Sequence, residues 1–321
     1  MRRAERVHAA RMRVLKGALA ALTAAAVALF FLVVPFRALL PADAISPRGE
    51  GAMRIHFLSV GQGDCTVVEF PDGDALIIDA GDGSFSANNA LVRYLKGLDV
   101  SALTLIATHA DSDHFGGFAQ ILQLFEVEQV FLPVIGASTD AYARFLAAVE
   151  AEGCATDELV RYDVIARPSG AYAVCISPHA AQETDENDAS ATLYLSYAGV
   201  NILLCADMSA ARENMLLAEL ELGEDIFDSA AYAVRLHETD ILKVSHHGSA
   251  YASGQEWLEY LSPETAILSC GRGNAYRHPS GEALSRLAGV GAQIYRTDEL
   301  GHIIITVAEG GYTIDTQGGV Q

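Results

Sequence analysis

Short apolar runs that end in an acid or a histidine constrain the fold of this chain more than any other feature of its sequence. They recur between residues 53 and 307, and segments with helical periodicity separate them into two series. Because a sheet must bury its apolar face, two such series predict two sheets packed face to face with helices outside. We expect an α/β or α+β fold, forming one domain over residues 53–321.

Helical stretches and strands can be placed along most of this domain. The expected helices lie at 87–98, 140–152 and 209–222. In the second half, the expected strands lie at 192–197, 201–205, 241–244, 265–269, 293–297 and 302–307. Strands of this length that are interrupted by helices are typical of layered α/β architectures.

The N-terminal region differs sharply from the rest in charge and hydropathy. Residues 1–16 carry six basic side chains against the single acid Glu5. Residues 17–36 contain no charged side chain. A helix of twenty residues is about 30 Å long, enough to cross the apolar core of a bilayer. We therefore expect 17–36 to be a transmembrane signal anchor and 1–16 a basic cytoplasmic tail, following the positive-inside rule.

Residues 41–52 are rich in proline, glycine and alanine, and they predict a linker that leads to an extracytoplasmic domain. The sequence Ala42-Asp43-Ala44 also allows cleavage by a signal peptidase after Ala44, which would give a secreted protein. Against cleavage, the apolar run exceeds the roughly 7–15 residues usual for a signal peptide. An uncleaved anchor in the cell membrane is therefore the preferred prediction.

The charge of the chain limits its partners. The whole chain has a net charge of −20, and the part after residue 40 carries 14 basic and 40 acidic side chains, a net of −26. A fold this acidic repels nucleic acid and anionic lipid unless metal ions or a local basic patch intervene. The sequence carries no signal from which a protein partner could be inferred.

Residues 109–114, His-Ala-Asp-Ser-Asp-His, bring four candidate metal ligands to the end of an apolar strand. His109 and Asp111 alternate and so face one way, whereas Asp113 and His114 fall in the following turn and can face another. Loops at strand ends are where functional sites usually form. The spacing suits two neighbouring metal ions rather than one.

Three other strand ends repeat this pattern. Asp79 ends one apolar run, Asp207 ends a second, and the adjacent His246 and His247 end a third. Each could instead cap a turn by binding backbone N–H groups, and for Asp79 that alternative stays open. The tight turn at 61–64, Gly-Gln-Gly-Asp, is expected at the same end of the strands as these candidate ligands. It either offers backbone N–H groups to an anion or is a plain hairpin turn.

These motifs resemble a known family. HADSDH matches the HxHxDH signature of the metallo-β-lactamase superfamily in its HxDxDH form. VGQGDCTVVEF, LIIDAG, ILLCAD, KVSHHGS and SCGRGNAYRHP resemble, in the same order, the metallo-β-lactamase-like domain of the competence protein ComEC family. The resemblance runs from about residue 53 to 306 and implies an αββα sandwich. One apolar segment stands where full ComEC proteins have a polytopic channel part, so DNA uptake does not follow from it.

The resemblance also implies a binuclear metal centre. Its metal ligands would be His109, Asp111, Asp113, His114, Asp207 and His246. His109 and Asp111 would hold the first ion, and Asp113, His114 and one histidine of the 246–247 pair would hold the second. Asp207 would bridge both ions, and Asp79 would orient the ligands from beneath.

Larger superfamily members usually add a third histidine to the first metal site. No histidine lies between residues 180 and 207, so that place is empty or filled by a side chain such as Asn187 or Ser190. Three carboxylates and about three imidazoles form a harder donor set than three histidines. The two ions are therefore expected to be Zn²⁺ or Mn²⁺.

Such a centre suits hydrolysis of a phosphodiester by an activated water. Asp207 or Asp113 would accept a proton from the water, while His247 and His278 would protonate the leaving group or bind phosphoryl oxygens. DNA is the substrate that the resemblance implies. The acidic charge keeps a cell-wall or lipid-linked phosphodiester open, and a non-catalytic metal-binding module is the remaining alternative.

Overall fold

The computed structural model describes residues 12, 15–23, 36–178, 184–221, 227–229 and 231–318. The chain divides into two compact units, Met1–Pro41 and Ala42–Gln321. In the first unit, residues 15–23 are helical and the 3-10 helix η1 covers Phe36–Leu39.

Among these described residues, no helix is both long enough and apolar enough to span a bilayer. Residues 24–35, most of the predicted anchor, lie outside the described part of the chain, as do nearly all residues of the predicted cytoplasmic tail. The transmembrane anchor therefore stays a prediction.

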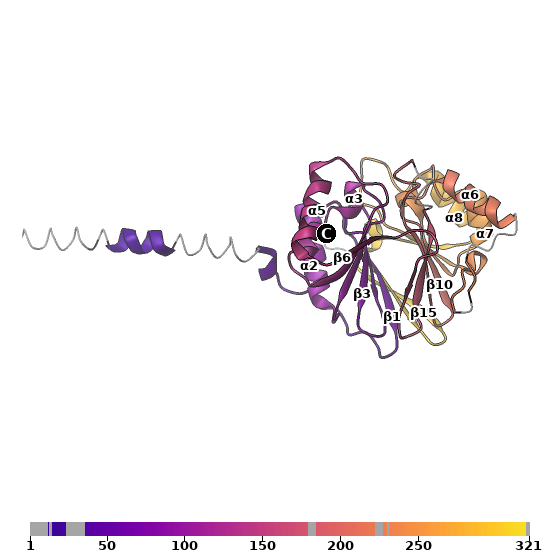
Figure 1. Ribbon diagram of the computed structural model, residues 1–321. Coiled ribbons are helices and arrows are strands. Elements are labelled where there is room, and N and C mark those ends of the chain that lie inside the picture. The colour runs from indigo at the N-terminus through magenta and orange to yellow at the C-terminus, as the bar shows by residue number, and fades with distance from the viewer. Residues whose placement is uncertain are drawn as a thin grey trace, which may run out of the picture. The chain divides into compact units, whose positions relative to one another are not determined.

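The second unit is a sandwich of two sheets between two layers of helices (Figure 1). The first sheet has the order β15-β14-β1-β2-β3-β4-β5-β6, which corresponds to Gly311–Gln317, His302–Ala308, Met53–Phe57, Thr66–Glu69, Ala75–Ile78, Leu103–Ile106, Val127–Leu132 and Ala155–Glu158. The second has the order β13-β12-β11-β10-β9-β8-β7, which corresponds to Gln293–Arg296, Thr265–Leu268, Ile241–Lys243, Val200–Leu204, Thr192–Tyr197, Tyr172–Ser177 and Val164–Ala166.

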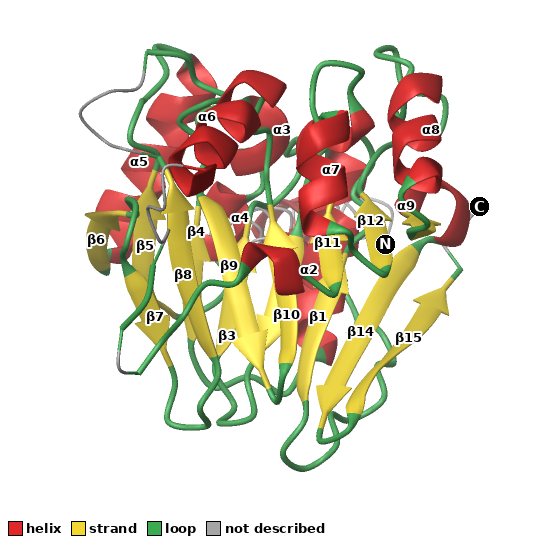
Figure 2. Ribbon diagram, turned by 90° about the vertical axis from the view of Figure 1, so that its right-hand side faces the viewer, coloured by secondary structure: helices red, strands yellow, loops and turns green. Residues whose placement is uncertain are grey.

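Helices cover the outer face of each sheet (Figures 1 and 2). The first sheet carries α2 (Phe85–Gly97), α3 (Ser112–Phe115), α4 (Phe118–Leu122) and α5 (Asp140–Glu152). The second carries α6 (Ala210–Glu221), α7 (Gln255–Leu261) and α8 (Gly281–Gly289). Shorter elements are η2 (Leu236–Glu238), η3 (Ser245–Gly248) and α9 (Thr297–Leu300). Hydroxyl side chains cap α2, α5 and α8 by accepting from a backbone N–H in the first turn.

Successive side chains of the central strands enter different apolar cores. In β2, Val67 packs toward the helices of the first layer, whereas Val68 packs into the core between the two sheets. In β10, Ile202 faces the core between the sheets, and Leu203 faces the helices of the second layer, where Trp257 is fully buried. Because both faces of each sheet are covered, these strands are continuously apolar and do not alternate with polar residues.

The topology brings the predicted site residues to one edge of the sandwich. β3 pairs in parallel with β4, and β10 pairs in parallel with β11. The carboxyl ends of each parallel pair therefore open at the same edge. Asp79 directly follows β3, and the other motif residues follow β4, β10 and β11 within a few residues.

The segment predicted as a linker packs against the domain. From residue 42 onward it belongs to the second compact unit. The backbone N–H of Asp43 donates to the carbonyl of Arg93 in α2 at 3.0 Å, and their side chains form an ion pair. Ile45 packs against the core under the same helix. A half-buried isoleucine, an ion pair and the hydrogen bond from Arg54 Nη1 to the Ser46 carbonyl thus hold a stretch whose composition suggests a free linker.

Candidate metal centre

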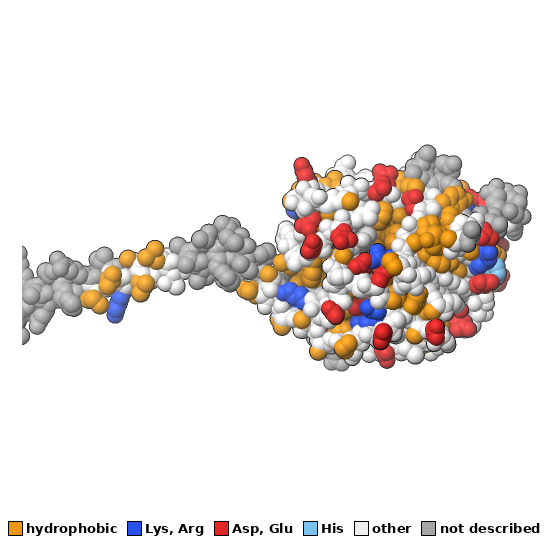
Figure 3. Space-filling model, turned by 60° about the horizontal axis from the view of Figure 1, so that its bottom comes forward, with side chains coloured by type: hydrophobic (Ala, Val, Ile, Leu, Met, Phe, Trp, Pro, Cys, Tyr) orange, Lys and Arg blue, Asp and Glu red, His pale blue; other side chains and the backbone are white. Residues whose placement is uncertain are grey.

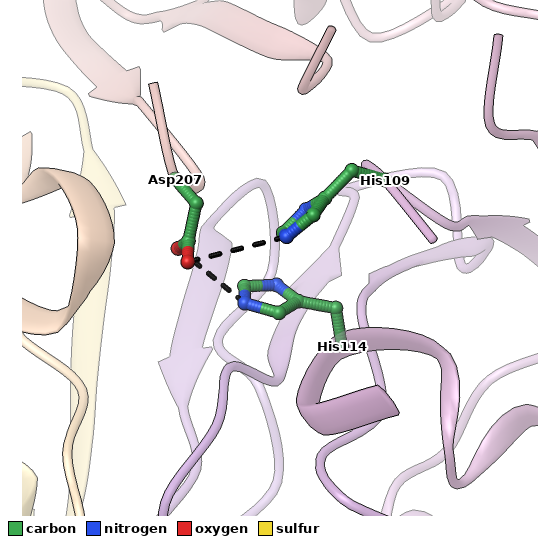
Figure 4. Close-up of side chains that lie close together, drawn as sticks. All are labelled: His109, His114 and Asp207. Atoms are coloured by element: carbon green, nitrogen blue, oxygen red, sulfur yellow. Dashed lines mark ion pairs between the residues drawn. The ribbon is translucent and has the colours of Figure 1, made fainter. Parts of the chain in front are cut away.

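The imidazoles of His109 and His114 converge on the carboxylate of Asp207 (Figure 4). His114 Nε2 lies 3.3 Å from Asp207 Oδ1, and His109 Nε2 lies 4.0 Å from Asp207 Oδ2. His247 Nε2 lies 3.8 Å from the same Oδ2. All four side chains are buried, so the first sheet and the second sheet meet here through polar ligand atoms.

Each of these three imidazoles is oriented through its Nδ1 atom. His114 Nδ1 donates to Asp79 Oδ2 at 2.7 Å, His247 Nδ1 donates to the Ser269 carbonyl at 3.0 Å, and His109 Nδ1 lies 3.1 Å from Thr108 Oγ1. Their Nε2 atoms are buried and have no hydrogen-bond partner within the described chain. A protein partner on one ring nitrogen and a bare second nitrogen is the arrangement of metal-ligating histidines.

The donor set fits divalent metal ions. Two groups have ligand atoms that all lie within 4.8 Å of one another and match the predicted motif: His109, His114 and Asp207, and Asp113, His114 and His247. Asp113 Oδ2 lies 3.4 Å from His247 Nε2. Imidazole nitrogen and carboxylate oxygen are the ligands that Zn²⁺ and Mn²⁺ accept, and an ion here would satisfy the bare nitrogens.

Two predicted ligands lie at the rim of these groups. Asp111 Oδ2 is 3.7 Å from His109 Nε2, and its side chain is 46% exposed. His246 Nε2 is 3.6 Å from Asp207 Oδ2, and its side chain is 30% exposed. The more deeply placed member of the histidine pair is thus His247, which we predicted as catalytic, whereas His246, predicted as a ligand, belongs to neither group.

Asp79 has both roles that its sequence context left open, since it caps a turn and also orients metal ligands. Its carboxylate accepts from the Thr108 N–H at 2.9 Å and from Thr108 Oγ1 at 2.8 Å, as a turn-capping residue does. The same carboxylate accepts from His114 Nδ1. Because the Thr108 hydroxyl gives its only proton to Asp79, it can accept one from His109, so Asp79 orients both imidazoles.

Non-glycine residues adopt left-handed backbone conformations around this centre. Asp79, Ala206, His246 and His247 have φ values of 58°, 45°, 47° and 53°. Such angles cost of order 1 kcal/mol or more and persist only where the surroundings enforce them. The two adjacent left-handed histidines turn both imidazoles toward Asp207, an orientation that strand periodicity does not predict.

Two glycines allow the loop that bears Asp113 and His114 to approach its neighbours. A Cβ atom at Gly63 would overlap the carbonyl oxygen of Asp113, and a Cβ at Gly117 would overlap that of Ala80. Gly63 has a φ of +139°, which disfavours side chains in any case. Gly63 and Gly117 therefore let the backbone of the ligand loop pack directly against the backbone of its neighbours.

The electrostatics of the centre couple metal binding to proton release. Although burial opposes it, Asp207 and Asp64 raise the pKa of His247 to about 10, and Asp207 and Asp79 raise that of His114. Burial likewise opposes ionisation of Asp207, but His114 and His247 lower its pKa well below the usual value. A metal ion must displace the imidazole protons, since only the neutral ring binds metal.

His278 lies beside the histidine pair. Its ring centroid is 5.7 Å from that of His246 and 6.2 Å from that of His247. Asn274 holds its backbone by accepting from the His278 N–H at 3.0 Å and donating to its carbonyl at 2.5 Å. Burial, followed by the charges of His247 and His246, lowers the pKa of His278. His278 belongs to neither ligand group, and its Nδ1 has no hydrogen-bond partner among the described residues, so it flanks the centre.

The loop that carries Asn187 and Ser190 lies beside the same strand ends. The Ala191 N–H donates to the Thr108 carbonyl at 3.0 Å, and Asp188 accepts from the Ser209 N–H at 3.3 Å. Within the described residues, Asn187 Oδ1 and Ser190 Oγ are buried without a hydrogen-bond partner. The loop thus sits next to the residues that flank His109 and Asp207, where the third histidine was expected.

Asp64 and Lys243 were missed as site residues. Lys243 Nζ lies 2.7 Å from Asp64 Oδ2, and Asp64 Oδ1 lies 3.3 Å from His247 Nδ1. The signal in the sequence was a lysine inside the apolar run that precedes the histidine pair, because an unpaired lysine is almost never buried. Its partner could not be read from the sequence, since Asp64 lies about 180 residues earlier.

The chain belongs to the metallo-beta-lactamase superfamily, whose family model matches residues 58–272. It is 29% identical over 275 residues to ComE operon protein 3 of Bacillus subtilis, covering 81% of this chain and 33% of that protein. It is 24% identical over 237 residues to Recombination protein 2 of Haemophilus influenzae, covering 73% and 26%.

A third relative is Competence protein ComA of Neisseria gonorrhoeae, 25% identical over 266 residues, covering 83% of this chain and 33% of that protein. These relatives confirm the predicted resemblance to the ComEC family. The chain spans a third or less of the length of these curated relatives. The superfamily fold is that of metal-dependent hydrolases and implies divalent metal ions at the site described above.

Replacing Asp207 by Asn should lower the content of divalent metal, because one carboxylate faces three bare imidazole nitrogens. The measurement is elemental analysis of the full chain purified without chelator and then dialysed. Asp99→Asn is the matched control, since Asp99 is exposed beyond the far end of α2. A folded Asp207→Asn protein that retains all of its metal would contradict the assignment.

Proposed function

We propose that this chain is a membrane-anchored, extracytoplasmic phosphodiesterase that uses two divalent ions, Zn²⁺ or Mn²⁺. The observation that carries the proposal is the convergence of three bare imidazole nitrogens and the Asp113 and Asp207 carboxylates at one sheet edge. Two ions bound there would supply an activated water and neutralise the charge of an in-line displacement at phosphorus.

Two groups of ligands support the number of ions. Asp111 lies beside His109, and Asp113 lies beside His247. Both imidazoles face Asp207 Oδ2, whereas His114 faces Oδ1, so each oxygen of Asp207 has an imidazole nitrogen nearby and Asp207 could serve two ions. Three carboxylates, Asp111, Asp113 and Asp207, accompany the three imidazoles. This donor set is harder than three histidines, which keeps Mn²⁺ a candidate beside Zn²⁺.

The flanking side chains supply proton transfer and substrate orientation. Asp113, whose side chain is 29% exposed, can accept a proton from the attacking water, as can Asp207 from within the centre. Burial, followed by the charges of His247 and His246, lowers the pKa of His278, which favours its neutral form. A neutral ring suits donation of an N–H to a phosphoryl oxygen better than transfer of a proton to the leaving group.

The substrate that we propose is DNA or an oligonucleotide. The names of the relatives, a competence protein and a recombination protein, support this choice. The net negative charge of the chain favours the alternative substrate, a phosphodiester of the cell wall or of a lipid-linked compound. On the face drawn in Figure 3, acidic side chains are spread widely and basic ones occur in small separate groups. This face lies at the bottom of Figure 1, away from α3. The repulsion of a long anionic strand therefore follows from the net charge of −26 after residue 40.

Hydrolysis of bis-p-nitrophenyl phosphate by the full chain with Zn²⁺ or Mn²⁺ tests the activity. We expect Asp207→Asn to abolish it, and His278→Ala to lower kcat by about 10²-fold, the range for loss of one proton-transfer or positioning group. Asp99→Asn should match the unaltered chain. Absence of hydrolysis at full metal occupancy would leave only the non-catalytic metal-binding module.

Tyr276 offers a way to separate the candidate substrates. Its side chain is 69% exposed and its ring stacks on His278 with centroids 5.8 Å apart and planes 26° apart. An exposed aromatic ring beside the centre suits stacking of a nucleobase, which is worth about 1–3 kcal/mol. Tyr276→Ala should therefore lower kcat/KM for a single-stranded oligodeoxynucleotide by about 5- to 150-fold.

The same variant should leave cleavage of an abasic strand of equal length unchanged, and Tyr276→Phe should cleave both strands normally. Tyr162→Ala is the matched control, since Tyr162 is 46% exposed, follows β6, and has its ring against Phe227 and Arg161, which are not ligands. Equal loss on both strands would show a structural role for Tyr276. No loss on either would favour the cell-wall or lipid-linked substrate.

The proposed topology rests on the six basic residues before the apolar segment. Alkaline phosphatase, which folds only outside the cytoplasm, should be active when fused after residue 50. A fusion of a cytoplasmic reporter at the same place should be inactive. The reverse pattern would overturn the extracytoplasmic placement, and recovery of the domain from the medium would indicate cleavage near Ala44.

A further inference from the structure

A buried lysine and a buried aspartate meet beneath the metal ligands. Lys243 ends β11 of the second sheet, and Asp64 precedes β2 of the first sheet. Lys243 Nζ lies 2.7 Å from Asp64 Oδ2, and the two residues are 2% and 4% exposed. Lys243 Nζ also donates to the Val244 carbonyl at 3.0 Å. The pair therefore joins the two sheets through a buried ionic contact.

Asp64 touches three segments that bear or support ligands. Its Oδ1 lies 3.3 Å from His247 Nδ1. Its backbone N–H donates to the Asp113 carbonyl at 3.2 Å, and its own carbonyl accepts from the Gly81 N–H at 2.8 Å, two residues after Asp79. A single residue thus contacts the loop of Asp113, the turn after Asp79 and the ring of His247.

The position of Lys243 has an electrostatic reason. The carboxylates of Asp79, Asp113 and Asp207 already gather at this edge, and a further buried carboxylate would be costly without a nearby cation. The lysine ammonium at 2.7 Å supplies that cation on the side of Asp64 away from His247 Nδ1. Lys243 thus holds Asp64 through Oδ2, while Oδ1 faces His247 Nδ1, the ring nitrogen opposite the bare Nε2.

We infer that Asp64 and Lys243 are positioning residues for the ion held by Asp113, His114 and His247. Asp64, fixed by Lys243, and the Ser269 carbonyl together orient the His247 ring so that its Nε2 faces Asp113 and Asp207. Loss of the pair removes one of the two groups that face His247 Nδ1 and leaves only the Ser269 carbonyl, whereas His109 and Asp111 stay in place. The pair therefore controls the affinity for one of two ions. The inference rests on the proposed function only in requiring two ions.

The experiment is calorimetric titration of the metal-free full chain with Zn²⁺ alone. Lys243→Met and Asp64→Asn should each weaken binding of one Zn²⁺ by about 10- to 100-fold, as loss of groups that orient metal ligands does, and leave the other unchanged. Lys243→Arg keeps a buried cation but moves its charge, so it should fold and weaken the same ion by a smaller factor.

Arg54→Met is the matched control. Arg54 Nε donates to Glu69 Oε2 at 2.6 Å in an ion pair that is equally buried in the first sheet but does not touch the ligands. It should lower the thermal midpoint without changing either Zn²⁺ affinity. Unchanged affinities in the folded Lys243 and Asp64 variants, or equal weakening of both ions, would overturn the inference. Because the experiment measures Zn²⁺ binding, failure of this inference can be distinguished from failure of the proposed phosphodiesterase activity.

Discussion

The contact of Asp207 with imidazoles from the opposite sheet is the interaction on which the rest of the structure depends. Asp207 follows β10 of the second sheet, whereas His109 and His114 follow β4 of the first. They meet only because the sheets pack face to face and the parallel strand pairs open at the same edge. The apolar core between the sheets therefore supplies the free energy that holds the buried Asp207 carboxylate against the two imidazoles.

The same contact explains the chemistry around it. Burial removes water from the ligand atoms, so each needs a fixed partner, and Asp79, Thr108 and the Ser269 carbonyl provide partners for the Nδ1 atoms. The Nε2 atoms keep none within the part of the chain that the structure describes. Left-handed backbone at the histidine pair and close glycine packing are the local costs of this arrangement.

Much of the fold could be predicted because buried strands and amphipathic helices leave periodic signals. The helix expected at 140–152 and the strand expected at 192–197 have those bounds in the structure. The edge strand Ala155–Glu158 was not predicted, since all four of its residues are exposed and polar residues dominate it. Short helices such as Ser112–Phe115 lie within the ligand loop, where four residues give no period to detect.

The sequence by itself determined which side chains can bind metal and that they follow strands, because ligand chemistry and apolar runs are local properties. Only the tertiary structure decided that His247 lies deeper than His246, since left-handed angles at both residues set the ring directions. It likewise decided that Asp64 pairs with Lys243 across two sheets. Such partners are distant along the chain, and face-to-face packing of the sheets alone brings them within a hydrogen bond.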